Sequence, residues 1–315
     1  MNRAIIDGHC DVLDKLVHDP QLDFYREESL DASYPRLRRG GVKVQLMAIY
    51  VPDRVVRPTI RDVLRYVDTF HRKVLRPGFV EAVRTRRDLQ RVWEGEQLGA
   101  ILTLEGVDAL EGDLLNLRTC WYLGVRSVGL TWNYGNWAAD GVKEPRQGGL
   151  TGKGRKLIEE CNRLGMILDV SHLSEAGFWE LAELTKRPFI ASHSNVKALC
   201  PNPRNLNDAQ IAEIIRCGGR IGITFVPYFV RSLPPVTASD VLKHIDYIAA
   251  MGGVRNIVFG SDFDGIEQWI TGLENAGKYE TIGNELCKHY KPEQVELFLH
   301  GNWARFLQEQ LPAVE

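Results

Sequence analysis

Residues 157–172, LIEECNRLGMILDVSH, contain the pattern that decides the fold of this chain. The first part predicts a helix, because four apolar residues fall on one helical face: Leu157, Ile158, Cys161 and Leu164. Gly165 then suits the end of that helix. The next run, 166–170, is short and continuously apolar, which is typical of a parallel strand buried on both faces. A polar segment ending in His172 follows, so the stretch predicts a helix, a buried strand and a polar loop in succession.

The same succession recurs along the whole chain. The short apolar runs are eight in number, at 4–6, 42–50, 100–104, 127–130, 166–170, 188–191, 220–225 and 256–259. Helical patterns lie between them, and we expect Ser174 and Ser239 to cap two of the helices. Eight parallel strands in a chain of 315 residues favour a closed (β/α)8 TIM barrel, forming one catalytic domain over 1–315. A doubly wound sheet is the alternative, but no GxGxxG turn follows the first run.

Composition narrows the classes of function. The net charge is -2 and the pI is near 6.5, which gives no reason to expect nucleic acid as a partner. No apolar run approaches the roughly 18 residues that a membrane span needs, and the N-terminus shows no signal-peptide core. The six cysteines form no CxxC pair, so we expect buried thiols and a cytoplasmic protein.

Polar residues that follow the first apolar run predict a metal site. His9 and Asp11 are two positions apart, so in an extended segment they point to the same face and can reach one metal. Cys10, between them, points the other way and is expected to pack in the core. An HxD pair is weak support by itself, because many such pairs bind nothing.

Other runs end in residues of the same kind: Glu105, His172, His193 and Asp262. A single strand-end histidine usually stabilises a loop, and a single glutamate usually pairs with arginine. Asp169 is expected to be such a structural hydrogen-bonding residue. In a TIM barrel, however, the carboxyl ends of all strands lie on one face, where the active site forms. The joint pattern therefore predicts one site at this face. Only three of the eight histidines follow predicted strands, and the others lie in helical or loop contexts: His18, His71, His244, His289 and His300.

Imidazole and carboxylate ligands suit zinc, with manganese or iron as alternatives. Five ligands are too many for one catalytic zinc, which normally takes three and a water. Two Zn²⁺ ions about 3.5–4 Å apart, sharing a carboxylate, would use all five. Glu105 is the expected bridge, because it is the single carboxylate between the pairs His9/Asp11 and His172/His193.

Several longer stretches resemble the renal dipeptidase (membrane dipeptidase) family of the amidohydrolase superfamily. They are IDGHCD (6–11), LEGVDAL (104–110), the stretch from GLTGKG to AGFW (149–179), the stretch from PFIASH to NLND (188–208), NIVFGSDFDG (256–265) and HGNWARFL (300–307). The combination is specific, although no single stretch would be.

The resemblance implies a two-zinc barrel that hydrolyses dipeptides, including dipeptides with a D-residue at the second position. It implies that His9 and Asp11 hold one metal, that His172 and His193 hold the other, and that Glu105 bridges them. Arg204 is expected to bind the free carboxylate of the substrate, because a guanidinium matches a carboxylate in two parallel hydrogen bonds. Asp262 matches the proton-transfer carboxylate of the family, with Asp264 as its competitor. The resemblance also suggests a homodimer.

One position departs from the family. Many members have a histidine after the fourth strand, thought to stabilise the tetrahedral intermediate, and Trp132 stands there in this chain. Indole has one N–H donor, no acceptor and no charge, so Trp132, Asn133 or a metal replaces that function, or the substrate range differs. Two other hypotheses therefore stay open: an amidohydrolase acting on another amide, an N-acyl amino acid or a lactone, and a non-catalytic metal-binding barrel.

Overall fold

The computed structural model describes residues 3–26 and 30–314, and within these residues it contains one sheet of nine strands. All pairings between the strands are parallel. The strands are β1 (Ile5–Asp7), β2 (Val42–Tyr50), β3 (Val80–Ala82), β4 (Leu98–Glu105), β5 (Val125–Gly129), β6 (Ile167–Asp169), β7 (Ile190–Ala191), β8 (Arg220–Ile223) and β9 (Ile257–Phe259).

The sheet closes into a barrel. β1 pairs with both β2 and β9, and β2 pairs with β4 from Val44 opposite Gly99 to Tyr50 opposite Glu105. β3 pairs only with the first residues of β4, so it lies outside the ring that the other strands form. The ring order is β1-β2-β4-β5-β6-β7-β8-β9, and each of these strands coincides with one predicted run. The (β/α)8 prediction is therefore confirmed, and the closed ring excludes a doubly wound sheet.

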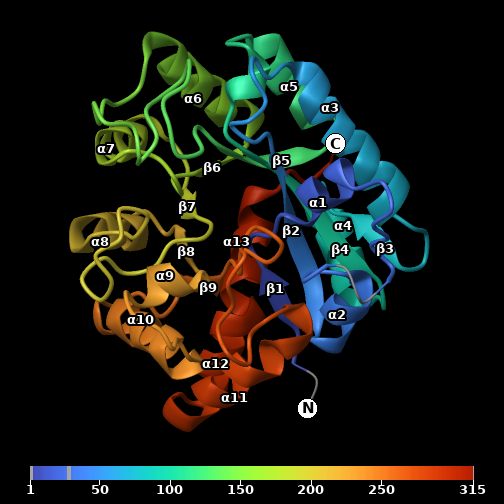
Figure 1. Cartoon of the computed structure of the whole chain (residues 1–315), viewed down its shortest axis with the longest axis vertical. Helices are drawn as coiled ribbons and strands as arrows, with labels where there is room; N and C mark the ends of the chain where they lie inside the picture. Colours follow the sequence, from blue (N-terminus) through green and yellow to red (C-terminus); the bar gives the residue numbers. More distant parts are fainter. Residues whose placement is uncertain (1–2, 27–29, 315) are drawn as a thin grey trace.

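Helices surround the strands as an outer layer (Figure 1). They are α1 (Val12–His18), α2 (Tyr34–Arg39), α3 (Ile60–Thr69), α4 (Arg86–Glu94), α5 (Leu114–Tyr122), α6 (Gly152–Leu164), α7 (Glu175–Leu184), α8 (Asp208–Arg216), α9 (Pro227–Val230), α10 (Ala238–Ala250), α11 (Tyr279–His289), α12 (Pro292–Glu296) and α13 (Asn302–Gln310). Short 3-10 or π segments are η1 (Phe70–Val74), η2 (Asp108–Leu110), η3 (Ala276–Lys278) and η4 (Leu297–Gly301). No helix in the described part of the chain is both long and apolar enough to span a membrane.

Helix ends follow local chemistry. α6 ends at Gly165, whose φ of 73° lies in the left-handed region that suits glycine, and Ser174 caps α7 by accepting a hydrogen bond from the Gly177 backbone. The Ser239 prediction is wrong, because α10 begins at Ala238 and Ser239 lies inside the helix. Thr237 is its N-cap, and Thr237 and Asp240 satisfy each other's backbone N–H groups in a capping box.

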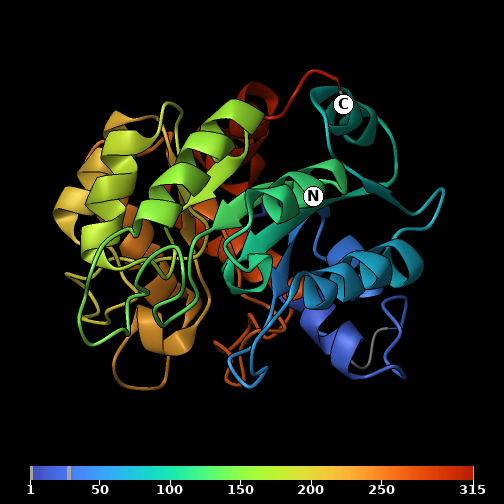
Figure 2. The same cartoon turned by 90° about the horizontal axis from the view of Figure 1, so that it is seen from above.

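The barrel interior and the layer beneath the helices are apolar. Cys10, Cys120, Cys161 and Cys200 are buried there, and all six cysteines are free thiols, as predicted. The long loops that follow the strands gather on one side of the molecule, at the lower edge of Figure 2, and the C-terminus lies on the other side. The fold thus brings the carboxyl ends of distant strands, and the polar residues that follow them, to one face.

Candidate metal centre and substrate cleft

His9 and Asp11 lie just beyond β1, in an extended segment that Cys10 continues by bridging to Phe263. His9 Nε2 is 3.4 Å from Asp11 Oδ2, while Cys10 is fully buried and packs in the hydrophobic core, as predicted. Among the described residues, His9 Nε2 and Asp11 Oδ1 are buried and have no hydrogen-bond partner. Both atoms are therefore unsatisfied unless a ligand binds between them.

Glu105 ends β4 and lies between the histidines from three other strands. Its Oε1 is 2.8 Å from His172 Nε2 and 3.5 Å from His193 Nε2. Its Oε2 is 3.5 Å from His9 Nε2. One carboxylate thus faces both pairs of predicted ligands, with one oxygen toward each pair.

Hydrogen bonds on the far sides of the rings orient His172 and His193. Nδ1 of His172 is 3.0 Å from Asn133 Oδ1, and Nδ1 of His193 is 2.7 Å from Ser192 Oγ. Because Asn133 Oδ1 can only accept, His172 carries its proton on Nδ1 and presents a lone pair from Nε2. Burial first, and then nearby positive charges, hold the pKa of both histidines well below the usual value, which keeps them neutral.

These neutral ligands converge on one point. The Nε2 atoms of His172 and His193 are only 2.8 Å apart, and both face Glu105. Lone pairs and carboxylate oxygens that meet in a buried space repel each other, and a cation relieves that repulsion. The donor set therefore fits a metal of the zinc type.

Asp262 follows β9 and completes the cluster, with Oδ1 3.6 Å from His9 Nε2. Two overlapping groups have ligand atoms within 4.8 Å of one another: His9, Glu105 and His193, and His9, Asp11 and Asp262. Burial raises the pKa of Asp262 to about 7 and the pKa of Glu105 to about 8. The positive charge of His9 acts in the other direction and lowers both pKa values, but by less. Burial alone would lower the pKa of His9, but Glu105 and Asp11 outweigh it and raise it to about 10. The cluster is thus an electrostatically coupled unit.

The backbone is strained at this site. His172, Asp262 and Asp264 adopt φ angles of 70°, 69° and 67°, in the left-handed region that residues other than glycine rarely occupy. Such strain concentrates at functional sites, where surrounding contacts enforce it. No feature of the sequence predicted these angles, because histidine and aspartate give no signal comparable to glycine.

Gly265 is required for the close approach of two carboxylates. A Cβ at this position would overlap Asp11 Oδ2 and lie 2.7 Å from Asp262 Oδ1. We expect Gly265→Ala to displace both side chains and to weaken metal binding at least about tenfold, since ligand geometry sets affinity. Isothermal titration with Zn²⁺ measures this. Gly152→Ala is the control, because a Cβ there meets no atom within 4 Å and Gly152 does not line the cleft. Unchanged zinc affinity in Gly265→Ala would contradict the steric role.

Asp264 has a different environment from Asp262. Its two carboxylate oxygens accept hydrogen bonds of 2.9 Å from the backbone N–H groups of Asp31 and Ala32. It therefore ties the segment before α2 to the loop after β9. Burial, with Asp31, raises its pKa to about 7.

Arg204 lies on the loop after β7 and is buried, with only 4% of its surface exposed. One guanidinium nitrogen donates to the carbonyl of His193 at 3.3 Å, and Nε has no hydrogen-bond partner among the described residues. Within the same residues it forms no ion pair, and its guanidinium lies 5.4 Å from the centre of the Phe229 ring. A buried, unpaired guanidinium is costly, so an anionic ligand would stabilise it.

Arg204 lines one cleft of about 660 Å³ together with four residues of the cluster: Asp11, Glu105, His172 and Asp262. Tyr50, Trp132 and Asn133 also line this cleft, and the centre of the Trp132 ring lies 5.1 Å from that of Tyr50 and 6.0 Å from that of His172. Trp132 thus lies in the cleft beside His172, one of the proposed ligands. The sequence did not predict the roles of Tyr50 and Ser192, which follow only from the tertiary arrangement.

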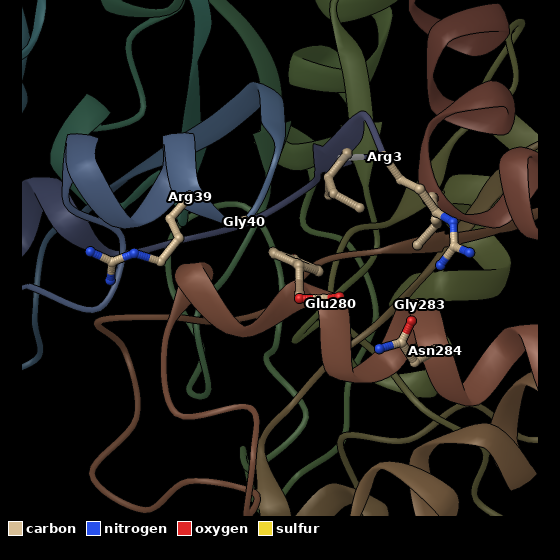
Figure 3. Close-up of a pocket in the computed structure, with 9 residues that line it drawn as sticks. Arg3, Arg39, Gly40, Glu280, Gly283 and Asn284 are labelled. Carbon is tan, nitrogen blue, oxygen red and sulfur yellow. The ribbon is translucent and has the colours of Figure 1, made fainter. Parts of the chain in front are cut away.

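A separate pocket lies at the other end of the barrel, beside the starts of β1 and β2 (Figure 3). Arg3, Glu280 and Asn284 surround it, and the Arg39 guanidinium points away from Arg3. It contains none of the clustered histidines or carboxylates. The chemistry therefore belongs to the cleft at the carboxyl ends of the strands.

A TIM barrel with buried histidines and carboxylates converging at that end defines the class of metal-dependent hydrolases. Residues 1–313 match the model of the membrane dipeptidase family, peptidase family M19, and the chain belongs to this family. It is thereby a metallo-dipeptidase, and the predicted family is confirmed.

Individual relatives agree with this assignment. The chain is 36% identical to an uncharacterised Klebsiella pneumoniae protein encoded 5′ of pqqA, over 70% of this chain and 85% of that protein. It is 33% identical to the dipeptidase aclJ of Aspergillus oryzae, over 80% of this chain and 63% of that protein.

Two crystal structures have nearly the same fold. The metallopeptidase dipeptidase AC superposes with a TM-score of 0.91 at 27% identity, covering 100% of both chains. A Rhodobacter sphaeroides metallopeptidase superposes with a TM-score of 0.90 at 27% identity, covering 98% of this chain and 99% of that one. The latter structure contains a phosphinate mimic of the dipeptide L-Ala-D-Ala.

Proposed function

We propose that this protein is a binuclear zinc dipeptidase. Nε2 of His172 and Nε2 of His193 converge on Glu105 Oε1, and His9 Nε2 and Asp11 Oδ1 have no hydrogen-bond partner within residues 3–26 and 30–314. This arrangement is the observation that carries the proposal. His9 and Asp11 would hold one zinc, His172 and His193 the other, and Glu105 would bridge them. When bound, the metals would activate a water molecule and polarise the scissile carbonyl.

The chain's own residues supply binding and proton transfer. Arg204, which is buried and has no ion-pair partner in the described part of the chain, binds the C-terminal carboxylate of the substrate and so restricts the enzyme to short peptides. Asp262 lines the cleft next to the cluster, where it accepts the proton of the attacking water. It then returns this proton to the leaving amine, as a general base that becomes a general acid. Asn133 and Ser192 keep His172 and His193 oriented through their Nδ1 atoms.

The expected substrates are dipeptides, including those with a D-residue at the second position. The L-Ala-D-Ala mimic in the Rhodobacter sphaeroides structure supports this class. We expect the zinc-loaded protein to hydrolyse L-Ala-D-Ala, and the assay is release of free alanine. Preferential cleavage of an N-acyl amino acid or a lactone would instead indicate another amidohydrolase activity. Tight metal binding without hydrolysis of any of these compounds would indicate a non-catalytic barrel.

A further inference from the structure

One buried carboxylate joins the two segments that carry His9 and Asp262. Asp7 is the last residue of β1 and is fully buried, and among the described residues no cation pairs with it. Its oxygens instead accept hydrogen bonds from Ser261, the residue directly before Asp262. A buried carboxylate without a cation is costly, so hydrogen bonds of this kind must satisfy it.

Asp7 and Ser261 contact each other at two points. Oδ1 of Asp7 accepts from the backbone N–H of Ser261 at 2.8 Å, and Oδ2 accepts from its hydroxyl at 2.6 Å. Oδ1 also accepts a longer bond of 3.4 Å from the backbone N–H of His9, and the Ser261 hydroxyl oxygen lies 3.1 Å from the His9 carbonyl oxygen. The carboxylate thus fixes the segment before Asp262 relative to the segment that carries His9.

The residue next to this contact is strained. Asp262 has a φ of 69°, and surrounding contacts must keep a residue other than glycine in that region. The Asp262 N–H donates to the His9 carbonyl at 3.2 Å. Asp7 adds two bonds between the same segments, on the residue immediately before the strained one. These bonds therefore help to determine where the Asp262 carboxylate lies, with Oδ1 3.6 Å from His9 Nε2.

We propose that Asp7 is a positioning residue for proton transfer, an inference that rests on the proposed dipeptidase function. Asp7 does not line the cleft, so it acts through Ser261 and not on the substrate. Its contact holds Asp262 in the left-handed conformation from which the carboxylate reaches the attacking water. A displacement of about 1 Å in such a group can cost about a hundredfold in rate, so loss of the contact lowers kcat.

Asp7→Asn and Ser261→Ala each remove part of the contact. Asparagine has one acceptor oxygen in place of two, and alanine lacks the hydroxyl. For L-Ala-D-Ala we expect kcat to fall by about tenfold to a hundredfold in Asp7→Asn and by about tenfold in Ser261→Ala, with KM and zinc content nearly unchanged.

Asp240→Asn is the matched control. Asp240 is also buried, and it accepts from the N–H and the hydroxyl of Thr237 at 3.1 Å each, but it does not line the cleft. The control should lose stability and keep its kcat.

A double-mutant cycle separates positioning from a general loss of structure. Asp262→Asn can no longer transfer a proton, so adding Asp7→Asn to it should change kcat by less than about twofold. An equal loss of kcat in both backgrounds, or loss of zinc from Asp7→Asn, would overturn the inference, because Asp7 would then support the metal centre or the fold. If Asp7→Asn does not fold, Ser261→Ala in the same two backgrounds gives the same comparison.

Unchanged kcat in folded Asp7→Asn and in Ser261→Ala would overturn the positioning role while leaving the dipeptidase function standing. A fully active Asp262→Asn would overturn the role of Asp262 in the proposed function, and the inference with it.

Discussion

Asp262→Asn is expected to keep the bound metals and to lose most of kcat, by about 10²–10⁴-fold. An amide cannot accept and return a proton, and general acid–base catalysis contributes about this factor. The side chain lies at the cluster, with Oδ1 3.6 Å from His9 Nε2, so its loss should act on chemistry rather than on substrate binding. Steady-state kinetics, with metal content determined on the same sample, measures the effect.

Asp264→Asn is the matched control, two residues away. Asp264 uses both carboxylate oxygens to hold the backbone of Asp31 and Ala32, and an asparagine keeps only one acceptor. We expect a lower Tm and little change in kcat. An active Asp262→Asn beside a folded but inactive Asp264→Asn would show that the roles of the two carboxylates are reversed.

Arg204→Met should raise KM for a dipeptide by about a hundredfold with metal content unchanged, since removing one partner of a buried charge pair costs about 2–5 kcal/mol. A dipeptide amidated at its C-terminus should already be a poor substrate of the wild type. The Tm should hold or rise, because the substitution removes a buried guanidinium that has no ion-pair partner among the described residues.

Arg220→Met separates a ligand-binding arginine from a structural one. Arg220 is also buried, but its guanidinium donates to the carbonyls of Gly218, Gly219 and Asn302 at 2.7–2.9 Å. This variant should lose stability and keep its KM.

If amidated and free dipeptides react equally in the wild type, Arg204 does not bind the substrate carboxylate.

The barrel was predictable because buried parallel strands leave a simple signal. Each predicted run overlaps a strand of the ring, whereas β3 was missed because it lies outside the ring and its sequence, Val80-Glu81-Ala82, is not a continuous buried apolar run. Asp169 was also predicted correctly as a structural residue, since its carboxylate accepts hydrogen bonds from the backbones of Ser171 and Ser192. These features depend on local sequence and on the burial of whole elements.

The geometry of the site depends on contacts between distant segments. The sequence placed His172 and His193 at strand ends, and the structure brings their Nε2 atoms to 2.8 Å of each other. It did not predict that Ser192 orients His193, nor the left-handed φ angles of His172 and Asp262.

Titration of metal-free protein with Zn²⁺, with dipeptide hydrolysis followed in the same samples, tests the central claim most directly. We predict that activity saturates at about two zinc ions per chain, and that Glu105→Gln weakens both sites because the bridge loses its charge. A binuclear centre bridged by Glu105 would be contradicted if activity saturates at one zinc ion per chain. It would also be contradicted if Glu105→Gln still binds two zinc ions tightly.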